Sequence, residues 1–230
     1  IVGSTRSQTM IAKEWDKFDG KPHSGFYTQQ EMKELVKYAA DRNITIIPEI
    51  DLPGHMVAVL ATYPKLGCTG GPYKVRETWG VAEDVLCAGN DETYDFIKNI
   101  LEEVTEIFPS EYIHIGGDEC PKTNWKKCPK CQAKIKNLGI KGDSKHTSEE
   151  YLQSYVITFA EEVLAKKGRK MIGWDEILEG GLAPNATVMS WRGIGGAIEA
   201  AKSNHDAIMT PMSFCYFDFY QTDKTDKEPL

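Results

Sequence analysis

Short apolar runs alternate with amphipathic segments along the chain. Between residues 28 and 43 apolar positions recur with helical spacing, and Thr28 with Glu31 forms a capping box, so we predict a helix there. The apolar face of this helix holds Met32, Leu35, Val36, Ala39 and Ala40. Residues 43–51 that follow are β-branched and mostly apolar, which is typical of a strand buried on both faces of a parallel sheet.

The same alternation continues to the end of the chain. It predicts helices over residues 92–108, from a second capping box at Thr147 and Glu150 to Gly168, and over 197–203. It predicts further strands over residues 111–115, 170–174, 186–191 and 207–212. Five strands alternating with helices indicate a parallel α/β fold, either an open doubly wound sheet or a (β/α)8 barrel.

The residues just past each predicted strand distinguish these two folds. Each strand is followed by polar or aromatic side chains, in chain order Glu49, Asp51 and His55; Asp118 and Glu119; Trp174, Asp175 and Glu176; Trp191 and Arg192; Tyr216 and Asp218. Barrel active sites draw residues from many strand ends, whereas an open sheet uses one switch point. We therefore predict a TIM barrel, incomplete because 230 residues and five βα units fall short of a typical barrel of about 250 residues.

Charge and hydropathy exclude two classes of partner. The chain holds 27 Lys and Arg against 34 Asp and Glu, a net charge of −7, and binding to nucleic acid or an anionic membrane surface depends mainly on clustered cations. Transmembrane helices need about 18 or more consecutive apolar residues, and no stretch approaches that length. We expect neither nucleic acid nor membrane as a partner.

The strongest local signal for chemistry is the pair Asp118 and Glu119 after the strand at 111–115. Adjacent strand residues point to opposite faces, so both carboxylates enter one pocket only if the backbone bends, which Gly116 and Gly117 permit. Two carboxylates held close favour retention of a proton by one of them, which prepares a general acid. The alternative interpretation is a surface Asp-Glu pair in a loop.

Four ordered motifs carry a resemblance to a known family. They are Pro-Glu-Ile-Asp-Leu-Pro-Gly-His at 48–55, His-Ile-Gly-Gly-Asp-Glu at 114–119, Gly-Trp-Asp-Glu at 173–176 and Ser-Trp-Arg-Gly at 190–193, joined by Gly-Phe-Tyr-Thr-Gln at 25–29. Over residues 3–220 the chain resembles the catalytic barrel of the family 20 β-N-acetylhexosaminidases. The resemblance implies a partial barrel over residues 1–220, holding strands 3 to 7 of eight, and a polar tail over 221–230.

The resemblance also implies a reaction. Terminal non-reducing β-linked N-acetyl-hexosamine would be hydrolysed with retention, with the substrate's own acetamido oxygen as nucleophile and an oxazolinium intermediate. Glu119 would act as general acid and then as base, and Asp118 would orient the acetamido N–H and stabilise the positive charge. The partner is then an amino-sugar glycoside, and we expect an exported enzyme (periplasmic, secreted or lysosome-like) whose signal peptide is not in this chain.

The remaining site residues follow from the same resemblance. Trp174 and Trp191 would wall the acetamido pocket, Tyr216 would hydrogen-bond the acetamido oxygen, and Asp218 would bind a sugar hydroxyl. His55 would sit behind Glu119 and tune its pKa, and Glu49 and Asp51 would support these residues without touching the sugar.

Each of these residues has a plainer interpretation. The two tryptophans could be core packing, and His114 in mid-strand reads as an interior histidine with satisfied hydrogen bonds. Asp175 and Glu176 could cap a helix start, and Arg192 could be an ion-pair partner.

The six cysteines leave the redox compartment undecided. Cys68 and Cys87 bracket a loop rich in Gly and Pro, so they predict a disulfide in an exported protein and free thiols in a cytosolic one. Cys128 and Cys131 form a C-x-x-C pair that invites a zinc interpretation, with Cys120, His114 or His146 as further ligands. No second C-x-x-C exists, so we favour a redox disulfide over zinc and expect no metal and no organic cofactor.

Two alternatives in function stay open. The family pattern places an arginine and an aspartate on earlier strands and further Trp and Glu contacts on a later one, and none is present here. The chain could therefore be a catalytically weak or inactive fragment that binds amino sugars; an ordinary glycosidase with two enzyme carboxylates is a third hypothesis. A barrel lacking three strands has two open sheet edges, so we also predict either self-association or a longer parent protein.

Overall fold

Five parallel strands form the centre of the computed structural model, which describes residues 2–4, 18–22, 24–77 and 80–217. They are β3 (Glu49–Leu52), β4 (Tyr112–Gly116), β5 (Lys170–Trp174), β6 (Thr187–Ser190) and β7 (Ala207–Met209). Their order in the sheet is their order in the chain, and every neighbouring pair is parallel. A doubly wound sheet reverses its strand order at a switch point, whereas a barrel does not. The predicted α/β class with consecutive barrel-type strands is confirmed.

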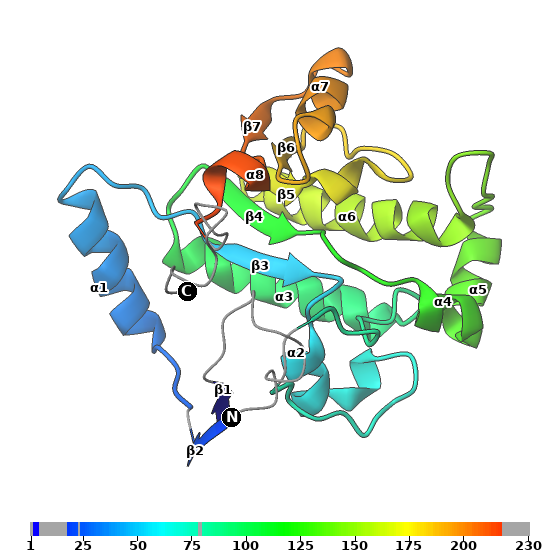
Figure 1. The fold of residues 1–230 in the computed structure, drawn as a ribbon, viewed down its shortest axis with the longest axis horizontal. Coiled ribbons are helices and arrows are strands. Elements are labelled where there is room, and N and C mark those ends of the chain that lie inside the picture. The colour runs from blue at the N-terminus through cyan, green and yellow to red at the C-terminus, as the bar shows by residue number, and fades with distance from the viewer. Residues whose placement is uncertain (1, 5–17, 23, 78–79, 218–230) are drawn as a thin grey trace, which may run out of the picture.

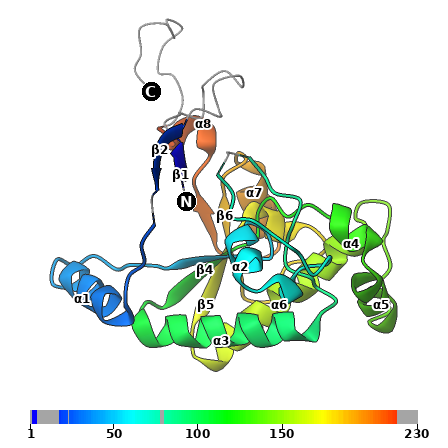
Figure 2. The same ribbon diagram turned by 90° about the horizontal axis from the view of Figure 1, so that it is seen from below.

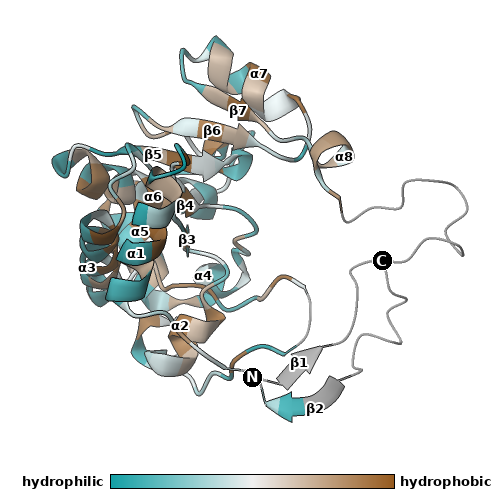
Figure 3. Ribbon diagram, turned by 90° about the vertical axis from the view of Figure 1, so that its left-hand side faces the viewer, coloured by the Kyte–Doolittle hydropathy of each residue, from teal (hydrophilic) through white to brown (hydrophobic). Residues whose placement is uncertain are grey.

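Three helices connect these strands and cover one side of the sheet (Figures 1 and 3). Helix α3 (Asp91–Ile107) joins β3 to β4, α6 (Ser148–Lys166) joins β4 to β5, and α7 (Gly195–Lys202) joins β6 to β7. Figure 2 shows α3 running beneath the sheet, and α3 packs beside α6. The buried core between helices and sheet is aliphatic and includes Ile97, Leu101, Ile113, Ile115, Leu152, Val156 and Met171.

Local sequence signals set the helix ends as predicted. The Thr147 side chain accepts from the Glu150 amide, the Glu150 side chain accepts from the Thr147 amide, and α6 begins at the next residue. The same reciprocal capping box at Thr28 begins α1 (Gln29–Ala40). Gly168 follows α6 with a φ of 68°, a left-handed conformation that costs glycine no Cβ clash.

The strand predicted over residues 43–51 is wrong in its start and its burial. Only Glu49–Leu52 pair with β4, and these four residues are not buried on both faces. Among the described residues β3 has a neighbour on one side only, so Ile44 and Ile47 stay 58% and 43% exposed. Leu35 of α1 is 46% exposed for the same reason, since nothing described covers that part of its apolar face.

Shorter elements lie in the loops that follow β3 and β4. Helix α2 (Val57–Thr62) and the 3-10 helix η2 (Pro64–Leu66) follow β3, and α4 (Thr123–Lys127) and α5 (Pro129–Asn137) follow β4. Figure 1 places these elements toward the arrowheads of β3 and β4, the carboxyl ends of the strands. A 3-10 helix, η3 (Asp175–Leu178), follows β5, and α8 (Met212–Cys215) follows β7.

An antiparallel pair that the sequence analysis did not predict precedes these elements. Strands β1 (Val2–Ser4) and β2 (Phe18–Pro22) form their own two-stranded sheet. The tail predicted over residues 221–230 lies outside the described residues. No helix in the described part of the chain is long and apolar enough to cross a membrane.

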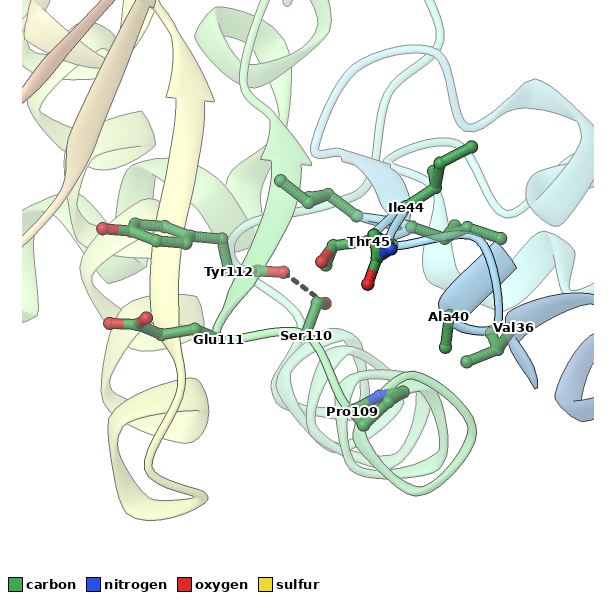
Figure 4. Close-up of a pocket in the computed structure, with 11 residues that line it drawn as sticks. Val36, Ala40, Ile44, Thr45, Pro109, Ser110, Glu111 and Tyr112 are labelled. Carbon is green, nitrogen blue, oxygen red and sulfur yellow. Dashed lines mark hydrogen bonds between the residues drawn. The ribbon is translucent and has the colours of Figure 1, made fainter. Parts of the chain in front are cut away.

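A cavity of about 680 Å³ opens at the other end of the sheet, where β3 and β4 begin (Figure 4). It is lined by Val36 and Ala40 of α1, by residues 43–47 before β3, and by residues 109–112. Two of the lining residues are hydrogen-bonded to each other, since the Ser110 hydroxyl donates to the Tyr112 carbonyl oxygen at 2.7 Å. The apolar lining beside β3 is the surface that a neighbouring strand would cover in a closed barrel.

We predict that the 230-residue chain self-associates through this open edge. Light scattering on a size-exclusion column should show a mass that rises with protein concentration, because Ile44 and Ile47 leave apolar surface beside unpaired strand groups. Ile47→Lys should reduce the association, whereas Leu138→Lys, at a similarly exposed apolar residue on α5's end, should leave it unchanged. A monomer at every concentration would contradict the prediction.

Candidate active site

The turn after β4 places Asp118 and Glu119 at the carboxyl edge of the sheet. Gly116, Gly117 and Glu119 have φ values of 67°, 93° and 43°, so the backbone leaves strand geometry where the glycine pair predicted a bend. A Cβ on Gly116 would overlap the carboxylate of Asp51. Glycine at this position therefore lets β3's acidic side chain lie against the turn.

His55 joins the two carboxylates. Its Nε2 lies 3.4 Å from Asp118 Oδ2 and 3.3 Å from Glu119 Oε2. The loop that carries it packs on the β4 turn, because a Cβ on Gly54 would lie 2.9 Å from the Asp118 carbonyl oxygen. His55 has a φ of 53°, and left-handed backbone at non-glycine residues such as His55 and Glu119 is a strain that clusters at functional sites.

The charges in this cluster balance through His55 and Asp51. The hydrogen bond to Asp118 raises the pKa of His55 to about 9, so the imidazole is protonated at neutral pH. Burial, followed by repulsion from Asp118, raises the pKa of Asp51 to about 8, so this carboxyl group keeps its proton at neutral pH. The sequence predicted that one of two crowded carboxylates, Asp118 or Glu119, would keep a proton. In the structure the raised pKa that crowding and burial produce is found at Asp51, which was predicted only to support these residues.

The opposite wall of the cluster contains Trp174, Glu49 and His114. Trp174 Nε1 donates to Glu49 Oε1 at 2.9 Å, and its ring meets the His114 ring edge-on with centroids 4.9 Å apart. His114 Nδ1 accepts from the Gly116 amide at 3.0 Å, so the proton of the neutral ring sits on Nε2. Burial lowers the pKa of His114, which favours this neutral form.

Three buried polar atoms here have no hydrogen-bond partner among the described residues. They are Asp51 Oδ1, Asp118 Oδ1 and His114 Nε2. Buried polar atoms are nearly always paired with protein, water or ligand. His114 is an interior histidine as predicted, with its Nδ1 paired, while its Nε2 is one of the three atoms that a polar group could pair with.

A second group of residues follows β5 and β6. Trp191 Nε1 donates to Glu176 Oε2 at 3.0 Å, and burial raises the pKa of Glu176 to about 7. Arg192 lies 3.3 Å from Asp175 Oδ1 and 3.1 Å from Glu179 Oε1, so its interpretation as an ion-pair partner is confirmed. Asp175 and Glu176 begin η3 but are buried in these contacts.

The two aromatic residues past β6 and β7 lie together. The Trp191 and Tyr216 rings stack with centroids 6.4 Å apart at an interplanar angle of 18°. Both side chains are half-buried, so Trp191 is not core packing. Asp218 lies outside the described residues.

A cavity of about 310 Å³ connects the two groups. Glu119 lines it from β4 and Glu176, Glu179 and Arg192 line it from the loops after β5 and β6. Gln153 of α6 also lines it and donates to the Gly117 carbonyl at 2.7 Å, which supports the turn. Sequence analysis missed Gln153, although a buried polar residue between apolar positions of α6 was the available signal.

Asp51, His55 and Asp118 also offer three ligand atoms within 4.8 Å of one another, a spacing that a cation could use. A metal-bound histidine must be deprotonated, whereas the contacts of His55 favour its protonated form. The contacts of His55 therefore fit hydrogen bonding to the two carboxyl groups better than metal coordination.

Carboxylates, tryptophans and a histidine gathered at the carboxyl edge of consecutive parallel strands define the site of an α/β-barrel protein. Comparison with known proteins gives the family. Residues 2–230 match the model of glycosyl hydrolase family 20, catalytic domain, and the chain belongs to this family.

Relatives with similar sequences share this assignment. The chain is 53% identical over 225 residues to a beta-hexosaminidase of Porphyromonas gingivalis, covering 97% of this chain and 27% of that protein. It is 36% identical to a beta-hexosaminidase of Akkermansia muciniphila, covering 96% of this chain and 45% of that protein. The chain therefore spans well under two thirds of the length of these relatives.

A solved structure shows the same fold. The crystal structure of beta-N-acetylhexosaminidase from Bacteroides fragilis matches with a TM-score of 0.71 and 40% identity, over 83% of this chain and 37% of that one. The family and the fold thus agree with the motifs at the strand ends, while the roles of individual residues stay predictions.

We predict from these contacts that His55 titrates with a pKa of about 9 and remains charged at lower pH. Nuclear magnetic resonance of the imidazole carbons should resolve it from His114, whose pKa should lie below the ordinary value of about 6.5. Asp118→Asn should lower the pKa of His55, because the main cause of its elevation is removed. A His55 pKa at or below about 6.5 in the unaltered protein would contradict the proposed charge balance.

Proposed function

We propose that the protein hydrolyses terminal non-reducing β-linked N-acetyl-hexosamine residues by a retaining, substrate-assisted mechanism. The observation that carries the proposal is the contact of His55 with both Asp118 and Glu119, beside three buried polar atoms without partners. The family and the names of the relatives support the reaction class. A related structure, the Streptomyces plicatus beta-hexosaminidase at 28% identity, is described in complex with the product GlcNAc, which supports the sugar class.

In the first proposed step Glu119 acts as the acid. Its side chain is 37% exposed against 16% for Asp118, a position suited to a leaving group that departs toward solvent. The Glu119 carboxyl proton moves to the glycosidic oxygen as the bond from that oxygen to the anomeric carbon breaks. The acetamido oxygen attacks the same carbon and forms a cyclic oxazolinium ion.

Asp118 stabilises the charge that develops in this step. The acetamido N–H donates to its carboxylate as the ring closes, and the unpaired Oδ1 is available for that bond. A fixed anion stabilises the cationic transition state more than the neutral ground state, so it lowers the barrier.

In the second step Glu119 acts as the base. Its carboxylate takes a proton from water while the water oxygen attacks the anomeric carbon and opens the oxazolinium ring. Two displacements at the same carbon return the original configuration, and Glu119 regains its proton. These steps use only side chains, water and the substrate.

The aromatic residues define the proposed acetamido pocket. Trp174 is held by Glu49, and Trp191 is held by Glu176 and by the stacked Tyr216, so both indole rings are fixed before substrate arrives. Aromatic faces suit the methyl group and the apolar face of the sugar. We assign the Tyr216 hydroxyl to the acetamido oxygen and Asp218 to a sugar hydroxyl on the family resemblance.

His55 and Asp51 are positioning residues in this proposal. The charged imidazole lies within ion-pairing distance of Asp118 and Glu119 and holds both side chains in place, and it offsets their repulsion once Glu119 has given up its proton. Neutral Asp51 fills the space beneath the glycine turn without adding a further charge.

We predict that Glu119→Gln lowers kcat by roughly 100- to 10,000-fold, the usual contribution of a general acid. The loss should be larger for chitobiose than for nitrophenyl N-acetyl-β-glucosaminide, because a sugar alkoxide needs protonation to leave and nitrophenolate needs it less. Glu162→Gln on the exposed side of α6 is the matched control and should keep full activity. Equal losses with both substrates would contradict the role of Glu119 as acid.

Substrate assistance makes a separate prediction. A β-glucoside that lacks the acetamido group should not turn over, whereas a thiazoline analogue of the intermediate should inhibit strongly. Asp118→Asn should weaken thiazoline binding, since its carboxylate accepts from the N–H of the protonated thiazoline ring, which mimics the oxazolinium ion. Equal turnover of glycosides with and without the acetamido group would instead support a glycosidase with two enzyme carboxylates.

The second candidate function is sugar binding without turnover. It applies to the 230-residue chain by itself, which spans 27% and 45% of the two relatives given above. Thiazoline binding with no hydrolysis by the chain itself would support this function, and hydrolysis would exclude it.

We further propose that the enzyme acts outside the cytoplasm and on no membrane or nucleic acid. The support is the proposed substrate class, since glycans with terminal amino sugars are displayed on secreted and surface molecules, together with the acidic net charge of −7.

A further inference from the structure

Four cysteines from two distant parts of the chain converge beside the loops described above. One sulfur from each of Cys68, Cys87, Cys128 and Cys131 lies within 4.8 Å of the other three. The Sγ of Cys87 is 3.7 Å from that of Cys128 and 3.7 Å from that of Cys131, and the Sγ of Cys68 is 3.9 Å from that of Cys131. Cys87, Cys128 and Cys131 are buried, and all four thiols are free.

These separations match a tetrahedron of sulfurs around one metal ion. A Zn–S bond of about 2.3 Å implies an S···S edge of about 3.8 Å in a tetrahedral site. Two disulfides would instead divide the sulfurs into two bonded pairs, each at about 2.0 Å. Cys87 is equally distant from two other sulfurs, which fits a shared central ion and not a partner in a pair.

The local backbone presents the cysteines in two pairs. Cys128 directly precedes α5 and Cys131 lies in its first turn, where the positive end of the helix dipole favours thiolates. Cys68 and Cys87 each follow one member of an isolated antiparallel bridge, Gly67 to Leu86, so the bridge brings them side by side. The amide of Cys87 donates to the Leu66 carbonyl at 2.8 Å and extends this pairing.

Close backbone packing joins the two pairs. A Cβ on Gly89 would overlap the backbone of Lys130 and Cys131, so glycine is needed for this approach. The Gly89 amide also donates to the Cys87 sulfur, as amides commonly do around metal thiolates. Trp125 is fully buried next to the pairs and donates from Nε1 to the Leu86 carbonyl at 2.9 Å.

We propose that Cys68, Cys87, Cys128 and Cys131 bind one zinc ion as a structural tetrathiolate site. Four protein ligands leave no open position, which is the arrangement of structural and not catalytic zinc. The site ties the loop after β3 to the segment after β4, and these same connections begin with His55 and Glu119. The ion thus braces the rim of the active site without touching substrate.

This proposal corrects three expectations from the sequence. Of the two alternatives for Cys68 and Cys87, the disulfide expected in an exported protein is absent and both thiols are free. The suggested ligands Cys120, His114 and His146 are not in the cluster. The second pair of ligands exists without a C-x-x-C spacing, because the Gly67–Leu86 bridge replaces it.

Metal analysis of the protein tests the proposal. Protein purified without chelator should contain one zinc ion per chain by mass spectrometry of the metal, and X-ray absorption should show four sulfur neighbours at about 2.3 Å. Cys131→Ser should lose the zinc, whereas Cys215→Ser, at an exposed cysteine outside the cluster, should retain it.

A second readout does not depend on any variant that could fail to fold. Exchange of cobalt into the unaltered protein should give the visible absorption of tetrahedral thiolate coordination, and a chelator should lower its unfolding temperature. Folded protein that stays free of zinc after dialysis against zinc, peptide mapping that finds these cysteines in disulfides, or iron at the four sulfurs would each overturn the proposal.

Discussion

The contact of one imidazolium with two carboxylates is the interaction on which the rest of the site depends. His55 Nε2 lies within hydrogen-bonding or ion-pairing range of Asp118 and Glu119, which come from the neighbouring strand. Without a positive charge between them, Asp118 and Glu119 would repel one another in the proposed step in which Glu119 has given up its proton. The pKa values of His55 and Asp51 are both raised. A proton on His55 adds a positive charge and a proton on Asp51 removes a negative one, so the net charge of the cluster stays close to zero.

The parallel sheet makes this contact possible. Neighbouring parallel strands end at the same edge, so the segment after β3 meets the segment after β4 without a long excursion. Two glycines then allow the approach, because Gly54 lies against the Asp118 carbonyl and Gly116 lies against the Asp51 carboxylate. A side chain at position 54 would push the His55 loop away from Asp118, and one at position 116 would displace Asp51, so the geometry of the charges depends on the absence of two Cβ atoms.

Sequence patterns predicted the parts of this structure that depend on local physics. Helix α6 begins at its capping box and ends before Gly168, because both signals act within a few residues. The gathering of polar and aromatic side chains at the strand ends was also predictable, since the end of each apolar run marks the sheet edge. The start of β3 was not, because strand length depends on neighbours, and β3 has one neighbour among the described residues. The pairing of Trp174 with Glu49, 125 positions apart in the chain, likewise follows only from the fold.

The cysteine cluster shows why long-range sites escape a search by spacing. Cys128 and Cys131 lie close together because the first turn of α5 contains the second of them, which a C-x-x-C spacing reveals in the sequence. Cys68 and Cys87 are instead brought together by a single bridge between loop residues, which leaves no such spacing. Both loops carry fully buried side chains, among them Leu86 and Trp125, so the four sulfurs converge inside a packed region and not at a loop tip. The proposed zinc ion would join the loop after β3 to the loop after β4 away from His55 and Glu119. The contacts of Gly54 and Gly116 join the same two segments next to these residues. If the proposed zinc ion is bound, the position of Glu119 depends on two independent restraints on the same pair of loops, and loss of either one should loosen the site before it unfolds the sheet.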